Sequence, residues 1–189
     1  RRLTRLSGSI ARSDAGTVRF DRIDVRTSEL TANASGQISE TDSRASYQVA
    51  LREVGIFVDQ LRGPVTASGS FAAGTGPWQV DSTVSAPAST TARIRGTAAR
   101  DFSRLDLAAT GSAALALANQ LIAPNLVDGT AQFDLRLSGP PSIAALSGTI
   151  RTSGARLVSP ASPINLQDIE TEITVGGGNA QLDALAGLA

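Results

Sequence analysis

Carboxylates are the only side chains of this sequence suited to acid–base catalysis. The chain has no histidine and no cysteine, and all its basic residues are arginine. Imidazole bases, thiolate nucleophiles, disulfides and soft-metal sites are therefore excluded. Two converging carboxylates would serve a glycosidase, and the candidates are Asp21, Asp24, Asp134, Glu170 and Glu172. Each occupies an outward position of an alternating strand pattern, which predicts a solvated face, no catalytic role and no metal site.

Glycine-rich segments and net charge exclude two further function classes. Residues 74–76 and 176–178 are rich in glycine, but neither is followed by the lysine and helix of a phosphate-binding loop, so both predict turns. The 17 arginines balance 17 acidic residues. A nucleic-acid-binding protein would show a basic excess, so we expect no nucleic-acid partner and no cofactor.

Apolar and polar residues alternate with a period of two over most of the chain. The clearest runs are residues 18–25, 47–51, 78–84, 130–137 and 169–175. This period is typical of strands with one buried and one wet face. The sequence therefore predicts an all-β protein whose sheets are oily on one side and charged on the other.

A short phrase recurs at intervals of about thirty residues. It places a glycine after Ser or Arg and before a strand-like pattern, at Gly8, Gly36, Gly69, Gly96 and Gly148. Gly8 to Gly36 is 28 residues, Gly36 to Gly69 is 33 and Gly69 to Gly96 is 27. Such a repeat predicts stacked β units, and a glycine at the same place in each unit indicates a repeated bend or close backbone approach.

One helix and one structural unit complete the predicted architecture. The alanine- and leucine-rich segment from Ser112 to Ile122 favours a short helix that ends before Pro124 and packs against the sheet as a plug, a brace or an end cap. No linker divides residues 1–189, although a seam is expected near 99–129. No signal peptide opens the chain, and the longest apolar stretch, 113–127, is too short and too polar to span a bilayer.

The apolar faces have two interpretations. They could pack against each other as a sandwich core, or one face could stay open as a groove. Aromatic residues make up only 4% of the chain, while Ala, Ser, Thr and Gly are abundant, so there is little volume to fill a sandwich interior. An underfilled apolar trough accommodates acyl chains.

The order of β phrases in the C-terminal half resembles the TamB/DUF490 family. The resemblance is carried by residues 129–141 (GTAQFDLRLSGPP), 146–157 (LSGTIRTSGARL) and 163–173 (PINLQDIETEI), with similar phrases at residues 6–10 and 34–38. It implies a β-sheet curled into a taco-like trough with an apolar interior. It also implies kinship with AsmA-like, bridge-type lipid transfer proteins of diderm bacteria.

The resemblance also implies a cellular setting. Members of the family are anchored in the inner membrane by an N-terminal helix, cross the periplasm, and are linked to phospholipid movement and outer-membrane assembly with an Omp85-type partner. In this family the partner-binding part is C-terminal. The sequence ends in residues 183–189 (DALAGLA) without the terminal aromatic of a barrel strand, so we expect the anchor and the partner contact to lie outside it.

We therefore predict an elongated, repeat-built, curved all-β sheet with one short helix, which shelters phospholipid acyl chains in the periplasm without a catalytic step. The alternatives are a β-solenoid of adhesin or autotransporter type with a filled core, and a carbohydrate-active enzyme with a carboxylate pair. The predicted lipid-lining residues are Val18, Phe20, Ile23, Val25, Ile38, Tyr47, Val49, Leu51, Phe71, Val80, Ile94, Phe133, Leu135, Leu137, Ile150, Leu157, Ile164, Leu166, Ile169, Ile173 and Val175.

Overall fold

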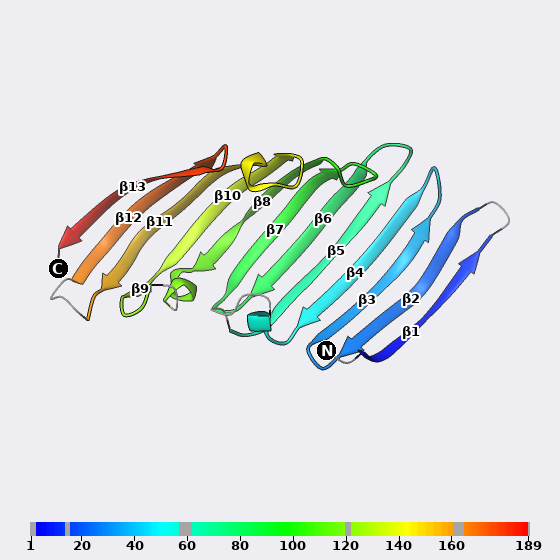
Figure 1. Cartoon of the computed structure of the whole chain (residues 1–189), viewed down its shortest axis with the longest axis horizontal. Helices are drawn as coiled ribbons and strands as arrows, with labels where there is room; N and C mark the ends of the chain where they lie inside the picture. The colour runs from blue at the N-terminus through cyan, green and yellow to red at the C-terminus, as the bar shows by residue number, and fades with distance from the viewer. Residues whose placement is uncertain (1–2, 14–15, 57–61, 120–121, 161–164, 189) are drawn as a thin grey trace.

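The fold of the chain is a single antiparallel β-sheet. The computed structural model describes residues 3–13, 16–56, 62–119, 122–160 and 165–188. Figure 1 shows the strands side by side as one layer. The strands are β1 (Leu3–Arg12), β2 (Val18–Thr27), β3 (Leu30–Ile38), β4 (Ser43–Leu51), β5 (Val65–Ala73), β6 (Trp78–Ala86), β7 (Thr90–Ala98), β8 (Leu105–Ala114), β9 (Leu126–Asp128), β10 (Thr130–Gly139), β11 (Leu146–Val158), β12 (Asn165–Gly176) and β13 (Asn179–Leu188).

The strands follow one another in the sheet in sequence order. Each strand from β1 to β8 pairs with the next, β8 pairs with β10, and β10 to β13 continue the same pattern. The three-residue strand β9 lies off this path and pairs with β11. Among the described residues, β1 and β13 are the first and last strands of this order, and each pairs with one neighbour. The sheet runs without a break through the expected seam, because β7, β8 and β10 are paired along their lengths.

The period-two pattern forms the sheet as predicted. Along β4, Arg44, Ser46, Gln48 and Ala50 are exposed, while the residues between them are buried or half-buried. The same alternation follows β10 from Ala131 to Leu137. Every strand thus presents an apolar face and a polar face, and the predicted all-β, elongated, curved architecture is confirmed.

The predicted helix over residues 112–122 is wrong where the structure describes it. β8 continues as a strand to Ala114, and only a single 3-10 turn follows, η2 (Leu115–Ala118). Helix propensity is a weak preference, and pairing overrides it here. The backbone of residues 105–114 is bonded on both sides, to β7 and to β10. The remaining 3-10 turns are η1 (Val54–Ile56) and η3 (Ile143–Ala145).

The repeated glycines lie where neighbouring strands approach closely, as the sequence predicts. A Cβ at Gly8 would lie 2.7 Å from the carbonyl oxygen of Arg22, and one at Gly69 would lie 2.6 Å from that of Asp81. At Gly96 and Gly148 it would overlap a neighbouring carbonyl oxygen outright. These glycines sit in odd-numbered strands, so the thirty-residue repeat corresponds to two strands.

The repeated glycines lie on the apolar face of the curved sheet. A Cβ on each of them would come within 3.0 Å of a backbone carbonyl oxygen on a neighbouring strand. The exposure of alanine side chains differs between the two faces. Ala34 and Ala109 on the apolar face are half-buried, whereas Ala50 and Ala108 on the polar face are exposed. Side chains of equal size are thus more crowded on the apolar side.

Most of the apolar face remains open to solvent. The accessible surface is 11943 Å², whereas a compact monomer of this mass exposes about 8,500 Å². Among the described residues, the buried apolar side chains are Leu51, Ala73, Ala98, Ala131, Ala155 and Ile169. A filled core between two layers would bury many more.

Candidate functional site

The strand register assembles a continuous row of apolar residues across the whole sheet. Each member lies directly opposite the next one on the neighbouring strand. We call it the central row: Leu6, Val25, Ala32, Val49, Ala67, Val84, Ala92, Gly111, Phe133, Ile150, Ile173 and Leu182. Neighbouring strands are about 4.8 Å apart, so the row is roughly 50 Å long.

Two further rows lie on one side of the central row, on the same face; the row named second below lies next to the central row, and the row named first lies beyond it. The first contains Ile10, Phe20, Gly36, Ala45, Phe71, Val80, Gly96, Leu107, Leu137 and Leu146. The second contains Gly8, Ile23, Ala34, Tyr47, Gly69, Ser82, Ile94, Ala109, Leu135, Gly148, Val175 and Ala180. The three rows carry no charge and only two hydroxyl groups.

Those two hydroxyls satisfy each other. Gly69 has no side chain, so the Tyr47 ring crosses over it and its hydroxyl donates a 2.7 Å hydrogen bond to Ser82 Oγ. The Tyr47 ring also stacks on Phe71, with centroids 5.3 Å apart. Because Ser82 is 95% buried, this polar pair is sealed by the ring and the face stays hydrocarbon-like.

All the predicted lining residues that the structure describes lie on this face. The three rows hold Phe20, Ile23, Val25, Tyr47, Val49, Phe71, Val80, Ile94, Phe133, Leu135, Leu137, Ile150, Ile173 and Val175, and the two rims hold Val18, Ile38, Leu51, Leu157, Leu166 and Ile169. Ile164 lies outside the described residues. Leu51 and Ile169 are each 9% exposed, so they pack the rim instead of lining an open surface.

Sequence reasoning missed part of the central row. Leu6, Val84 and Leu182 belong to it, and so do the small residues Ala32 and Gly111. The alternation of apolar and polar residues around Val84 was the signal that could have added Val84 to the predicted lining residues. The alanines and glycines gave no signal, because small residues occur on both faces of the sheet. Only the register between strands assigns each of them to a face and to a row.

The described part of the long connection between β8 and β10 packs beside Gly129 and β9. Leu115 of η2 lies 3.5 Å from the position of a Cβ on Gly129, and Ala155 lies beside the same position. Asn119 Oδ1 accepts a 2.7 Å hydrogen bond from the backbone N–H of Val127 in β9. The segment thus contacts its neighbours through a 3-10 turn in place of the predicted helix.

The polar face carries ion pairs between neighbouring strands. Arg93 and Arg95 both contact Asp81, at 2.9 and 3.2 Å, Arg136 contacts Asp106 at 2.8 Å, and Arg151 contacts Glu172 at 2.7 Å. The Arg93 side chain lowers the pKa of Asp81 through hydrogen bonds and charge. These side chains are largely exposed, which matches the solvated face predicted from the sequence.

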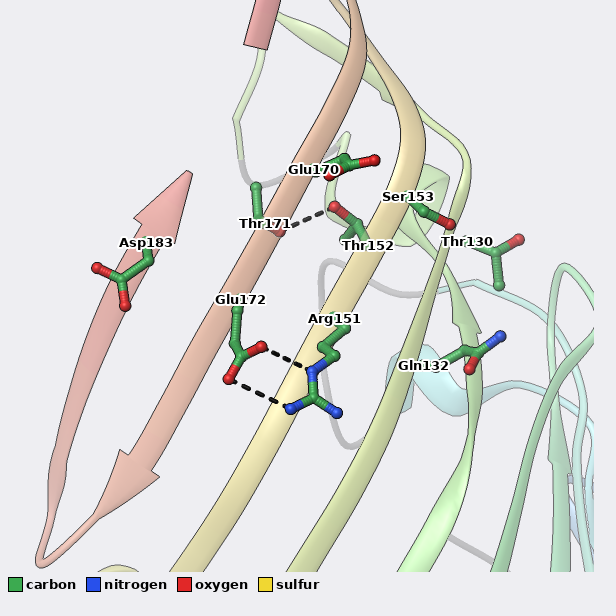
Figure 2. A pocket seen from close by; sticks show the side chains of 9 residues that line it. All are labelled: Thr130, Gln132, Arg151, Thr152, Ser153, Glu170, Thr171, Glu172 and Asp183. Carbon is green, nitrogen blue, oxygen red and sulfur yellow. Dashed lines mark hydrogen bonds and ion pairs between the residues drawn. The ribbon is translucent and has the colours of Figure 1, made fainter. Parts of the chain in front are cut away.

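An open hollow of about 690 Å³ lies on the polar face near β13 (Figure 2). Its lining includes Glu170, Glu172 and Asp183 together with Arg151. Arg151 lowers the pKa of Glu172 and keeps it ionised. A glycosidase needs one carboxyl group held protonated, and the hydrogen-bonded Glu172 is held in the opposite state.

Acid titration tests the Arg151–Glu172 ion pair. The folded-state pKa of Glu172 lies below its usual 4.5 because of Arg151, so its stabilising contribution is complete above that value. The contribution disappears as the pH falls through the lowered folded-state pKa. We expect Glu172→Gln to melt with a smaller acid-induced loss of stability than the wild type. Equal losses in thermal melts from neutral to acidic pH would show that the pair contributes nothing.

Single alanine substitutions of the other polar-face charges should have little effect. Asp134, Arg136 and Glu170 are exposed, so we expect each substitution to lower the free energy of unfolding by less than about 1 kcal/mol. Denaturant titration measures this change. A larger loss would mean that these side chains do more than cover a wet surface.

Fold and surface define an open, single-layer β-sheet protein with one long apolar face. Comparison of the chain with protein-family models, curated proteins and solved structures finds no match. In the part of the chain that the structure describes, no helix has the length and hydropathy needed to cross a membrane.

Proposed function

We propose that the apolar face shelters the acyl chains of phospholipids, so that the chain is a non-enzymatic segment of a lipid bridge. The observation that carries the proposal is the central row, an uncharged track that crosses the whole sheet without interruption. An acyl chain on this row keeps its methylenes away from water, and each one left exposed would cost about 0.8 kcal/mol.

The shape of the sheet favours a hydrocarbon chain as the occupant of this face. We infer from the close approach of neighbouring strands at Gly69, Gly96 and Gly148 that the sheet bends towards its apolar side. Two such inward-bent faces could not pack closely against each other, because closely packed sheets need matching surfaces about 10 Å apart. A flexible acyl chain adapts to the bend and to the small apolar-face residues on the strands between Phe71 and Phe133.

Movement along the face requires no chemistry from the protein. Successive positions of the central row differ little in polarity, so an acyl chain meets no large barrier as it slides from strand to strand. The Tyr47–Ser82 pair lies beside the row, and its internal hydrogen bond leaves the ligand no strong polar contact. Weak, repeated contacts of this kind suit transfer better than tight storage.

The cellular setting of the proposal rests on the resemblance to the TamB/DUF490 family. That resemblance implies a periplasmic setting between the inner and outer membranes, with an inner-membrane anchor and an Omp85-type partner contact that lie outside this sequence. The adhesin-type solenoid is the alternative, and it requires a filled core. The few buried apolar residues of the described chain favour the lipid-bridge proposal.

Native mass spectrometry of protein purified from a membrane-containing extract tests this function. We expect phospholipid adducts in the spectrum. After delipidation, we expect the protein to take up a fluorescent fatty acid. Lysozyme purified through the same extract controls for non-specific carry-over. Protein that carries no lipid and takes up no fatty acid would contradict the proposal and support the solenoid alternative.

A further inference from the structure

A strained turn holds the side chain of Phe102 in solvent. Phe102 lies in the connection between β7 and β8 (residues 99–104), where its φ is 57° and the residue is 55% exposed. The left-handed region favours glycine, and a bulky residue there is an outlier. The other described non-glycine residues with positive φ are Ala88, Ser89 and Asp168, which are small or polar. Strain of this kind gathers at functional positions, and an exposed ring gives the fold little in return.

Hydrogen bonds fix the turn that carries Phe102. The Ala99 N–H donates to the Arg104 carbonyl at 2.8 Å, and the Phe102 N–H donates to the Ala99 carbonyl at 2.9 Å. Asp101 Oδ1 accepts hydrogen bonds from the backbone N–H and the hydroxyl of Ser103, at 3.0 and 2.7 Å. A strained conformation persists where the surrounding contacts over-determine it, and this turn meets that condition.

Arg100 joins the turn to the connection between β5 and β6. Its Nε donates a 3.0 Å hydrogen bond to the Gly76 carbonyl, and a terminal nitrogen donates to the Gly74 carbonyl. The guanidinium also lies over the Trp78 ring, 5.2 Å from its centroid. The two connections therefore form one platform, which carries an arginine, a tryptophan and an exposed phenylalanine.

A second exposed apolar side chain lies at the same rim of the sheet. Leu105 lies opposite Ala98 on one side and Gly139 on the other, so the connections that follow β7 and β10 leave the sheet at the same rim (Figure 1). Ile143 of η3, in the connection after β10, is 77% exposed. This rim thus presents an aromatic and an aliphatic side chain that the fold leaves uncovered.

The charge of this rim suits the surface of a phospholipid leaflet. Residues 99–104 contain two arginines and one aspartate, and residues 140–145 contain no charged residue. Exposed apolar side chains beside arginine are typical of segments that lie at a membrane surface. The apolar tips match the hydrocarbon of a leaflet, and the positive charge beside Phe102 matches its phosphates.

We propose that this rim docks on a phospholipid leaflet, with the Phe102 ring at the boundary between headgroups and acyl chains and Arg104 at the phosphates. Aromatic side chains favour that boundary, and arginine is attracted to anionic headgroups. The inference rests on the proposed lipid function for its purpose, because a face that carries lipid needs a place to receive it. Leu105 at this rim is followed on the apolar face by Leu107, so a lipid that leaves the leaflet meets apolar side chains at once.

Co-sedimentation with vesicles of phosphatidylethanolamine and phosphatidylglycerol tests the docking. Phe102→Gly should weaken vesicle binding about tenfold, since it removes the ring. It should melt no lower than the wild type, because glycine adopts a φ of 57° without strain. Lost docking in this variant therefore cannot be attributed to unfolding. If the melting temperature does fall, Phe102→Asn is the second variant, because asparagine tolerates the same φ.

Two further variants are matched to Phe102→Gly. Phe102→Trp should bind vesicles as the wild type does, because it keeps an aromatic ring at the tip of the turn. Leu126→Ser removes another exposed apolar side chain, 52% exposed, from β9 at the opposite rim. It should leave vesicle binding unchanged, and equal losses in Leu126→Ser and Phe102→Gly would contradict a specific docking rim.

Arg104→Gln tests the contact with phosphates. The Arg104 side chain is exposed, and one arginine near an anionic surface accounts for about a fivefold change in binding. We expect that loss on vesicles that contain phosphatidylglycerol and no change on vesicles of phosphatidylcholine alone. Equal binding of Arg104→Gln and the wild type to the anionic vesicles would remove Arg104 from the contact.

Leu135→Asp separates this docking from the proposed lipid function. It should lose fatty-acid uptake and still bind vesicles, whereas Phe102→Gly should lose vesicle binding and still take up free fatty acid. Vesicle binding that Leu135→Asp abolishes and Phe102→Gly leaves intact would assign the membrane contact to the apolar face and overturn the docking rim. A wild type that takes up fatty acid but binds no vesicles would overturn the docking alone and leave the lipid function standing.

Discussion

Leu135→Asp is expected to leave the protein folded and abolish its capture of lipid. Leu135 lies in the row beside the central row, opposite Ala109 on one side and Gly148 on the other. These small neighbours leave the introduced carboxylate a path to water, so it need not be buried unpaired. We expect a loss of stability of about 1–2 kcal/mol and a cooperative circular-dichroism melt.

The loss of lipid follows from the position of the new charge. An acyl chain that passes Phe133 and Leu135 would have to cross an ionised group, which hydrocarbon does not solvate. Fatty-acid uptake and native mass spectrometry measure the effect. Gln132→Asp is the matched control, because Gln132 lies on the same strand but faces the polar side, opposite Arg151. It should bind lipid as the wild type does.

Two outcomes would contradict this assignment of the lining face. Global unfolding of Leu135→Asp would mean that Leu135 lies in a filled core, as the solenoid alternative requires. A folded variant that still carries lipid would place Leu135 outside the path of the acyl chain. Only the combination of a folded protein and lost lipid supports an open apolar face.

The alternation of apolar and polar residues predicted most strands, because a half-buried strand has apolar residues on one face and polar residues on the other. The run from Thr130 to Leu137 became most of β10. The segment 112–122 misled the prediction, since its alanines favour a helix in isolation. β8 instead extends to Ala114, because neighbours on both sides bond its backbone, and no local signal records that pairing.

The apolar face could be predicted only in part for the same physical reason. Large apolar residues such as Phe133 and Ile173 alternate with polar residues, and this alternation predicts which face of the strand is apolar. The continuity of the central row depends on Ala32, Ala67 and Ala92, which lie opposite larger residues on adjacent strands. That arrangement follows from the register between strands, and one sequence without its pairing partners does not specify it.

The distribution of charge distinguishes the two faces of the sheet. On the polar face, the pairs of Asp81 with Arg95 and Arg151 with Glu172 neutralise neighbouring strands without burying charge. Such pairs add little stability but keep that face wet. Among the described residues, the apolar face is then the surface suited to hydrocarbon.

Gly96→Ala is expected to destabilise the protein by roughly 2–4 kcal/mol. Gly96 has a φ of 146°, and a Cβ there would overlap the carbonyl oxygen of Asp106 on β8. The strands could relieve the overlap only by moving apart or flattening the bend. Denaturant titration measures the loss, and we expect weaker fatty-acid uptake in the variant because the apolar face opens.

Two other glycines separate the causes of this effect. Gly76→Ala is expected to change stability by less than about 0.5 kcal/mol, because a Cβ there meets nothing within 4 Å and its φ is unstrained. Gly16→Ala also meets open space but has a φ of 79°, so it isolates the backbone strain, about 1 kcal/mol. If Gly96→Ala cost no more than Gly16→Ala, the close approach of β8 would not be real, and the bend towards the apolar face would need another cause. A clearly larger cost would tie the repeated glycine to the curvature that makes this face suitable for an acyl chain.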